Sequence, residues 1–305
     1  MSEAGMRYLF EALKAGSMRA AGDKLNVAAS SISRQISQLE ARLGVGLIEK
    51  GRRGICLTQA GQLVIDHYRN QLADREALQA RLEDLRAVRS GTATLAVGEG
   101  FLGKSFTQML GRFSRDNPEI ELEIMTGSTQ EIVRMVTEDE AHMGLVFQTP
   151  HDLKVRVRAT IAQPLMAIMR PDHRFASFNW VSIADLASEA LCLAPPSFRL
   201  RQILAVAETA SNLHLEPVIT TNSINVMQEA VRSGIALTIL PQVSVWSELE
   251  EGSMISVPIE NEGMQGASVS LILRSGRQLE GAPMRLLQKV EAQLQSWNRQ
   301  FPAPE

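Results

Sequence analysis

Apolar side chains recur at helical spacing from the beginning of the chain. In the first predicted helix they stand three or four residues apart: Met6, Leu9, Phe10 and Leu13. Gly16 follows as a stop, and Ser17 is placed to cap a second helix that contains the small pair Ala20-Ala21. Asn26-Val27 interrupts that helix. The pattern therefore predicts short helices joined by tight turns.

A third helix is predicted over "AASSISRQISQLEARLG", where the apolar residues form one stripe: Ile32, Ile36, Leu39 and Leu43. At about 100° per residue, the opposite side of this helix carries small or polar residues around one long cation. Those residues are Ser30, Arg34, Ser37 and Ala41, flanked by Ser33 and Gln38. An ordinary exposed helix face would be richer in Glu and Lys, so this face calls for another explanation.

Serine side chains let a helix backbone approach the floor of a DNA groove, and their hydroxyls reach phosphates or base edges. Arg34 can form a fork on guanine, and Gln35 or Gln38 can pair with adenine. Two helices joined by a tight turn, the second with this face, predict a helix-turn-helix. The predicted DNA contacts on it are Ser30, Ser31, Ser33, Arg34 and Gln38. A solvated helix face is the alternative interpretation.

The segments "LIEK" and "ICLT" predict two short strands around the tip Gly51-Arg52-Arg53-Gly54. Such a hairpin places Arg52 and Arg53 beside the third helix, where they would contact the DNA backbone or the minor groove. They complete the predicted DNA-contacting set, although paired arginines at a tip can also serve solubility alone. A winged helix-turn-helix domain is therefore predicted over residues 1–58.

A long helix is predicted next, over about residues 59–89 with Thr58 as its cap. One apolar stripe contains Leu78, Leu82 and Leu85, and a second apolar side, towards the head, contains Leu63, Tyr68 and Leu72. A lone helix cannot bury such a stripe, so we expect the same helix of a second chain to cover it. Residues 59–90 are thus predicted to link the domains and to dimerise, with Ser90-Gly91 as a hinge.

The segment "GSMRAAGDKLNVAASSISRQISQLEARLGVGLIEKGRRGICLTQAGQLV" resembles the LysR-type transcriptional regulators. The resemblance rests on S-x-S-R-Q-I-x-x-L-E-x-x-L-G and on the L-T-x-A-G that begins the linker. Two departures stand out: Ala29-Ser30 replaces the usual Gln-Pro, and Ile48-Glu49 replaces Phe-Glu. The resemblance implies a cytoplasmic homodimer or homotetramer that binds promoter DNA and a small-molecule effector and meets RNA polymerase.

The same resemblance implies an α/β, two-lobed effector domain, similar to periplasmic binding proteins, over residues 91–305. The sequence supports this, because "ATLAVG", "IELEIM" and "HMGLVF" read as strands separated by helices, which is typical of a parallel sheet. We assign lobe I to residues 91–162 and 266–305, since "ASVSLILR" reads as a return strand, and lobe II to residues 163–265. An amphipathic helix closes the chain.

Ligands of open sheets sit at the carboxyl ends of strands, beside helix N-termini. Four loops meet this description: residues 99–102, 127–129, 195–199 and 222–224. The predicted effector-binding residues are Gly100, Phe101, Leu102, Ser128, Thr129, Phe147, Ser197, Phe198, Asn222 and Ser223. The alternatives are helix capping for the hydroxyl residues and core packing for the phenylalanines. Arg199 and Arg201 hint at a carboxylate on the effector.

The first of these loops also fits the phosphate-binding pattern G-x-x-x-x-G-K-[ST], from Gly98 to Ser105. This leaves a nucleotide-binding regulator as the alternative function. Glu99 inside the loop would repel a triphosphate, and no later strand ends in the Asp that would hold magnesium. The stretch also falls where the resemblance places the first effector loop, so we favour the effector.

Charge and composition add further limits. Residues 1–57 carry a net charge of +4, whereas the rest of the chain carries −7, so the head alone is suited to a polyanion. No apolar run is long enough for a membrane span, and the beginning of the chain lacks the features of a signal peptide. Cys56 and Cys192 are interpreted as small apolar residues. No metal site, cofactor or catalytic residue is predicted, and a solute-binding module alone would not explain the head.

Overall fold

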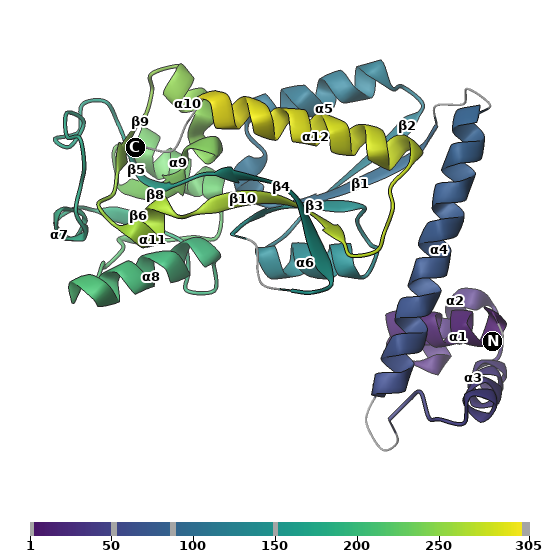
Figure 1. The fold of residues 1–305 in the computed structure, drawn as a ribbon. Helices are drawn as coiled ribbons and strands as arrows, with labels where there is room; N and C mark the ends of the chain where they lie inside the picture. Colours follow the sequence, from purple (N-terminus) through teal and green to yellow (C-terminus); the bar gives the residue numbers. More distant parts are fainter. Residues whose placement is uncertain (1–2, 50–53, 86–89, 149–151, 301–305) are drawn as a thin grey trace. The chain divides into compact units, whose positions relative to one another are not determined.

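The computed structural model describes residues 3–49, 54–85, 90–148 and 152–300 (Figure 1). The chain divides into two compact units, residues 1–79 with 276–278 and residues 80–275 with 279–305. None of the described helices has both the length and the apolar character needed to cross a membrane.

The first unit is a small helical domain. Its helices are α1 (Glu3–Lys14), α2 (Met18–Leu25), α3 (Ala29–Leu43) and the beginning of α4 (Gln59–Leu85). They enclose one apolar core: Met6, Leu9, Ala12, Ala21, Ile32, Ile36, Leu39, Leu47, Val64, Ile65 and Tyr68. The predicted stripe of the third helix is confirmed, because Ile32, Ile36 and Leu39 are buried and Leu43 packs against the same core.

The turns of this domain have local causes. Ser17 caps α2 as predicted, since its hydroxyl accepts a hydrogen bond from the amide of Ala20 at 3.1 Å. Asn26 ends α2 in the left-handed conformation, with φ of 54°. A Cβ on Gly22 would lie 2.7 Å from the carbonyl oxygen of Val27, so only glycine lets the turn fold back this closely.

The predicted hairpin is present as a single antiparallel bridge between Ile48 and Leu57. Two hydrogen bonds form this bridge: the amide of Glu49 donates to the carbonyl of Cys56 at 2.8 Å, and the amide of Thr58 donates to the carbonyl of Leu47 at 3.0 Å. The predicted tip, with Arg52 and Arg53, lies outside the described residues.

Helix α4 is described from Gln59 to Leu85, and the remaining predicted residues 86–89 lie outside the described ranges. Tyr68 is buried in the head and Leu72 packs against it. The prediction for Leu63 was wrong, since its side chain is 68 % exposed and does not face the head core. Leu78 and Leu82 of the predicted stripe are also exposed, at 58 % and 49 %.

The second unit contains two five-stranded sheets, each of which forms the centre of a lobe. The first lobe has strand order β2-β1-β3-β10-β4. Its strands are β1 (Gly91–Val97), β2 (Ile120–Thr126), β3 (Met143–Phe147), β4 (Val155–Ala162) and β10 (Ser268–Arg274), and its helices are α5 (Lys104–Asp116), α6 (Thr129–Thr137) and α12 (Gly281–Gln300).

The second lobe has strand order β7-β6-β8-β5-β9. Its strands are β5 (Leu165–Met169), β6 (Leu191–Leu193), β7 (Ile219–Thr220), β8 (Leu237–Pro241) and β9 (Ile255–Pro258). Its helices are α7 (Ile183–Leu186), α8 (Arg199–Ser211), α9 (Ile224–Arg232), α10 (Trp246–Glu250) and α11 (Glu262–Gln265). Two short 3-10 helices lie between elements, η1 (Glu99–Phe101) and η2 (Gln242–Val245).

The predicted return strand is confirmed, because β10 joins the first sheet beside β3. The predicted parallel pairing of the first three strands of this lobe is confirmed. Strand β1 runs parallel to β2 and β3, but β10 is antiparallel to both β3 and β4, since the chain comes back from the second lobe in the reverse direction.

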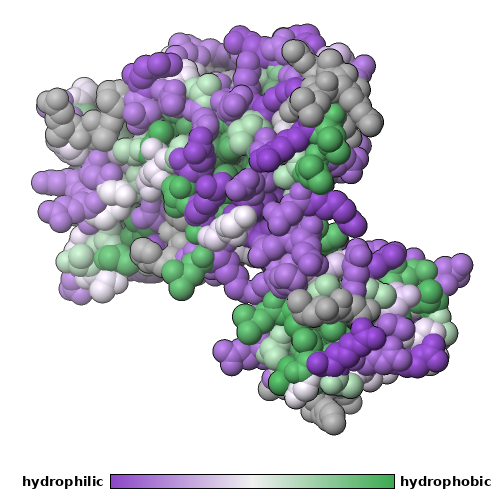
Figure 2. Space-filling view, turned by 45° about the vertical axis from the view of Figure 1, so that its right-hand side comes forward, coloured by the Kyte–Doolittle hydropathy of each residue, from purple (hydrophilic) through white to green (hydrophobic). Residues whose placement is uncertain are grey.

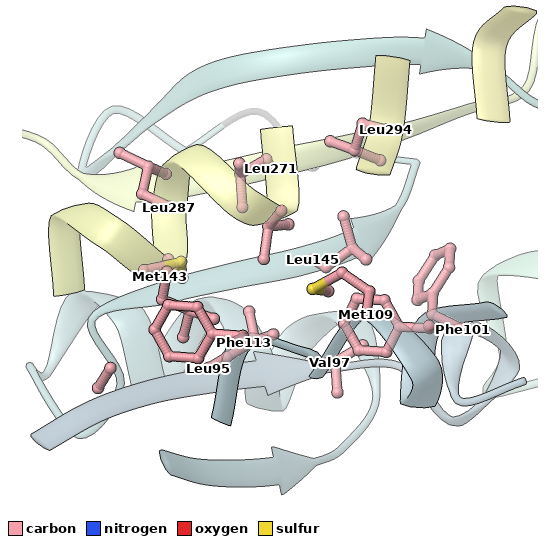
Figure 3. Close-up of a cluster of buried hydrophobic side chains, with 14 of the residues drawn as sticks. Leu95, Val97, Phe101, Met109, Phe113, Met143, Leu145, Leu271, Leu287 and Leu294 are labelled. Atoms are coloured by element: carbon pink, nitrogen blue, oxygen red, sulfur yellow. The ribbon is translucent and has the colours of Figure 1, made fainter. Parts of the chain in front are cut away.

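The inner strands of the first sheet, β1, β3 and β10, are buried on both faces, as their apolar residues require. Along β1, Leu95 and Val97 point into a core covered by α5 and α12, whereas Ala96 faces α6 on the other side. Figure 3 shows the larger core, with Met109 and Phe113 from α5 and Leu287 and Leu294 from α12 pointing toward the strands. This packing fixes the ends of the strands from which the predicted ligand loops extend.

Candidate nucleic-acid interface and ligand site

The outward face of α3 carries the side chains that the sequence predicts to contact DNA. Ser30, Arg34 and Gln38 are exposed, and Ser31 and Ser33 are half-buried. Among the described residues, no carboxylate forms an ion pair with Arg34, so its guanidinium can bind an external partner. These side chains face outward because the helical period places the buried stripe of α3 on the opposite face.

Two contacts hold α3 in place beneath this face. A Cβ on Gly5 would lie 3.1 Å from the Cβ of Leu39, so α1 crosses α3 at close range. Glu40 near the end of α3 accepts hydrogen bonds from the amides of Leu47 at 2.7 Å and Ile48 at 3.4 Å. The carboxylate thereby fixes the loop that leads from α3 to the hairpin.

The structure brings the first and fourth predicted ligand loops together. The hydroxyl of Ser223, at the beginning of α9, donates a hydrogen bond to Oε1 of Glu99 at 2.9 Å. A Cβ on Gly100 would lie 2.8 Å from Oγ of Ser244 and 3.6 Å from the side chain of Ile224. At Gly100, η1 of the first lobe therefore lies close to η2 and α9 of the second.

Ser128 and Thr129 take part in local hydrogen bonds. Ser128 forms a capping box at the beginning of α6, in line with the alternative interpretation of this residue as a helix cap. Its hydroxyl accepts from the amide of Glu131, and its own amide donates to Oε2 of Glu131 at 2.7 Å. These hydrogen bonds from Ser128 lower the pKa of Glu131. The hydroxyl of Thr129 donates to the carbonyl oxygen of Phe147 at 3.1 Å, which joins the second loop to the end of β3.

The three phenylalanines that were predicted to contact the effector have different surroundings. Phe101 is 3 % exposed and stacks on Trp297 with ring centroids 6.5 Å apart, so its ring belongs to the core of the first lobe (Figure 3). Its assignment as a ligand-contacting ring is corrected accordingly. Phe147 is half-buried and packs against apolar clusters of both lobes, and Phe198 is half-buried against the cluster that contains Ile224.

The remaining predicted residues lie mostly at the surface of their loops. Ser197 and Asn222 are exposed, and Leu102 is half-buried against the first-lobe core. The guanidinium of Arg201 is bound to the buried carboxylate of Glu208 by contacts of 2.5 and 3.2 Å. Arg201 is therefore unavailable to an effector, which corrects its predicted role, because burial of Glu208 requires a permanent cation beside it.

The phosphate-loop alternative is not supported by the geometry of residues 98–105. The amide of Phe101 donates to the carbonyl of Gly98 and the amide of Leu102 to that of Glu99, both at 3.0 Å. A phosphate loop needs such amides pointed at the anion. Nζ of Lys104 lies 2.9 Å from Oε1 of Glu251, a hydrogen bond that raises the pKa of Lys104.

Sequence reasoning missed Gln163, which lies where the chain first crosses between the lobes. Its side chain is 1 % exposed, and its Oε1 accepts a hydrogen bond from the amide of Val243 in η2 at 3.1 Å. Its Nε2 has no hydrogen-bond partner among the described residues. The one signal in the sequence is a polar residue directly before the apolar run of β5.

Within the described residues, no group of three His, Cys, Asp or Glu side chains could hold a metal ion. Exposed apolar side chains on the second unit are scattered: Leu153, Val157, Phe178, Trp180, Val206, Leu213, Val218, Val226 and Ile235. In the one face drawn in Figure 2, hydrophobic patches lie among hydrophilic ones.

Two protein families match the sequence. Residues 4–62 match the family described as bacterial regulatory helix-turn-helix protein, lysR family, and residues 86–295 match the LysR substrate binding domain. Among curated proteins, the HTH-type transcriptional activator CmpR of Synechocystis is 25 % identical over 255 residues, which cover 83 % of each chain.

Solved structures share the fold. A full-length OxyR variant from Pseudomonas aeruginosa aligns with a TM-score of 0.66 at 16 % identity, covering 97 % of this chain and 95 % of that one. CbnR in complex with its target DNA aligns with a TM-score of 0.54 at 20 % identity, covering 96 % and 100 %. The regulatory domain of Synechocystis CcmR in complex with 2-PG aligns with a TM-score of 0.58 at 20 % identity, covering 67 % and 97 %.

Proposed function

This chain belongs to the LysR family of bacterial transcriptional regulators, and on that premise we propose a function for each of its parts. Residues 1–58 bind promoter DNA, residues 59–90 join two such heads, and residues 91–305 bind a small-molecule effector. The protein acts in the cytoplasm as a homodimer or homotetramer and communicates with RNA polymerase. It regulates without catalysing a reaction and without a cofactor.

The observation that carries the DNA-binding role is the outward face of α3. Its exposed serines are small enough for close approach to the groove floor, and Arg34 is free to form two hydrogen bonds to a guanine. Ser30, Ser31, Ser33, Arg34 and Gln38 enter the major groove, while Arg52 and Arg53 contact the flanking backbone. The likeness in fold to a regulator bound to its target DNA supports this docking.

Two heads bind DNA better than one, because each contacts one half-site about one helical turn from the other. Leu78 and Leu82 on α4 are exposed in the single chain, and they lie one helical turn apart. In the proposed dimer the α4 helices of two chains cover these side chains. The spacing between the heads is then set by the helix pair.

The effector binds between the lobes, at residues 99–102, 127–129, 195–199 and 222–224. The proposed contacts are Gly100, Leu102, Ser128, Thr129, Phe147, Ser197, Phe198, Asn222 and Ser223, with the backbone of Phe101. The hydrogen bond between Glu99 and Ser223 supports this place, because it links the two lobes there. We propose that the oligomer has two arrangements that place the heads differently. An effector can shift the equilibrium between them only by as much as its binding free energy differs between the two.

The test is DNA binding by full-length protein, measured by fluorescence anisotropy on the DNA upstream of neighbouring genes and on random DNA. Arg34→Ala should cost about 1–3 kcal/mol on the operator and relax its specificity. Arg112→Ala removes the same charge from an exposed position of α5 and should bind as the unchanged protein does. Equal losses for Arg34→Ala on operator and random DNA would reduce Arg34 to a phosphate contact, and absence of any specific site would refute the function.

A further inference from the structure

The carboxylate of Glu99 extends from the first lobe to the second inside the proposed effector site. Its side chain is exposed, and its described partner is the hydroxyl of Ser223 at 2.9 Å. Ser223 stands at the N-cap of α9 but makes no side-chain cap hydrogen bond there, so its hydroxyl is committed to Glu99. An acidic group therefore occupies the point where a ligand would meet the beginning of α9.

The charge of Glu99 has no cationic partner among the described residues. Lys104, five residues further along, is held by Glu251, and Arg201 on the opposite lobe is held by Glu208. On the second loop, Glu131 adds another carboxylate at Ser128. On the third loop, Arg199 is exposed and its guanidinium donates to Oε1 of Gln202 at 3.3 Å, so one cation there stands against the carboxylates of Glu99 and Glu131. An anionic effector at the beginning of α9 would still meet the carboxylate of Glu99.

A second observation concerns a buried donor near the contact between the lobes. The unpaired Nε2 of Gln163 is a buried donor, and leaving such a group without an acceptor is unfavourable. Its Oε1 is fixed by Val243, and the next residue, Ser244, lies against Gly100 beside Glu99. Gln163 is thus connected through η2 to the contact at Gly100, and Glu99 beside that contact offers a carboxylate acceptor.

We propose that Glu99 makes this site selective for small metabolites without net negative charge, which carry a hydroxyl or ammonium donor for Glu99 and an acceptor for Gln163. Polyols, amino alcohols and zwitterionic amino acids share this chemistry. The proposal rests on the proposed function of the second unit as an effector-binding domain. The CcmR regulatory domain of Synechocystis, which shares the fold, is in complex with 2-PG.

The test uses full-length protein and isothermal titration calorimetry with two probes, the anion 2-phosphoglycolate and the amino alcohol serinol. Glu99→Gln keeps a hydrogen-bond acceptor for Ser223 but removes the charge, so it should bind 2-phosphoglycolate at least tenfold more tightly than the unchanged protein and serinol at least tenfold more weakly. Glu216→Gln, which removes a charge from an exposed position of the second lobe, should alter neither affinity.

Ser223→Ala separates the charge from the hydrogen bond between the lobes. It leaves the Glu99 carboxylate in place, so it should not show the tenfold gain in affinity for 2-phosphoglycolate that is expected of Glu99→Gln. An equal gain in Ser223→Ala and Glu99→Gln, or no gain in Glu99→Gln, would overturn the proposal. So would a preference of the unchanged protein for 2-phosphoglycolate over serinol.

Operator binding by the same proteins keeps this test apart from the proposed function. All four proteins should bind operator DNA with equal affinity in the absence of probes, since Glu99, Ser223 and Glu216 lie outside the DNA-binding head. Intact operator binding with no change in probe affinity would reject the role of Glu99 alone. Loss of operator binding in the unchanged protein would reject the regulator function itself.

Discussion

Gly61 and Leu47 approach so closely that a Cβ on Gly61 would lie 2.1 Å from the carbonyl oxygen of Leu47. The hydroxyl of Thr58 accepts from the amide of Gly61 at 3.0 Å and donates to the carbonyl of Gly46 at 2.7 Å. Together these contacts join the beginning of α4 to the loop after α3. They give a physical reason for the L-T-x-A-G pattern at this position.

Gly61→Ala should destabilise the head by about 1–3 kcal/mol, because the added methyl must displace backbone rather than a flexible side chain. Urea unfolding followed by circular dichroism measures the change. Gly111→Ala is the matched control, since Gly111 lies inside α5 with only the end of Arg115 near its added Cβ. That substitution should stabilise its helix by about 0.5–1 kcal/mol, and equal effects at both glycines would contradict the contact with Leu47.

Arg53→Ala should weaken binding to all DNA sequences alike, because a residue at the hairpin tip contacts backbone rather than bases. The slope of log affinity against log salt should fall by about one for the loss of one phosphate contact. Anisotropy titrations at several salt concentrations measure the slope. A loss confined to operator DNA would instead assign Arg53 to base recognition.

Ser128→Ala should remove the cap of α6 and cost about 0.5–2 kcal/mol of stability. If Ser128 also contacts the effector, the response to effector should weaken while operator affinity without effector survives. A fall in both together would leave Ser128 as a structural cap. Urea unfolding and anisotropy with and without effector make the distinction.

Glu131 gives the same cap a pH dependence. Its pKa in the folded protein is lowered below the ordinary value of 4.5 by hydrogen bonds from Ser128, so it binds fewer protons folded than unfolded. The stabilisation that the Glu131 carboxylate provides should be complete at pH values above its ordinary pKa of 4.5. It should be lost as the pH falls through the lower pKa that Glu131 has in the folded protein. Unfolding measured from pH 6 down to about pH 3 should show a shallower acid loss for Glu131→Gln.

Cys192 should resist thiol reagents in the folded protein. It is buried at 0 % exposure, and this burial raises the pKa of its thiol, so little thiolate forms at pH 8. With Cys56→Ser as the background, Ellman's reagent should report no reaction until denaturant is added. Rapid reaction of the folded protein would show that the strand β6 opens readily.

The sequence alone determined the helices of the head and the outward face of α3. Helical period fixes which side chains share a face, so the burial of Ile32, Ile36 and Leu39 placed Arg34 on the outside without knowledge of any neighbour. Caps are similarly local, and Ser17 and Ser128 act where their residue types predicted. The return of β10 to the first sheet was also readable from its apolar run.

Only the tertiary structure decided which loop residues remain available to a ligand. Phe101, Arg201 and Glu99 stand in similar positions in the sequence, next to helix starts, yet Phe101 packs on Trp297, Arg201 pairs with Glu208, and Glu99 reaches Ser223. The partners of Phe101 and Glu99 are distant along the chain. Arg201 and Glu208 are closer in sequence, and they pair because the Glu208 carboxylate is buried away from water and needs a cation beside it. Periodicity can place Arg201 and Glu208 on one face of α8, but it carries no information about the contact of Glu99 with Ser223, because that contact depends on how the lobes pack.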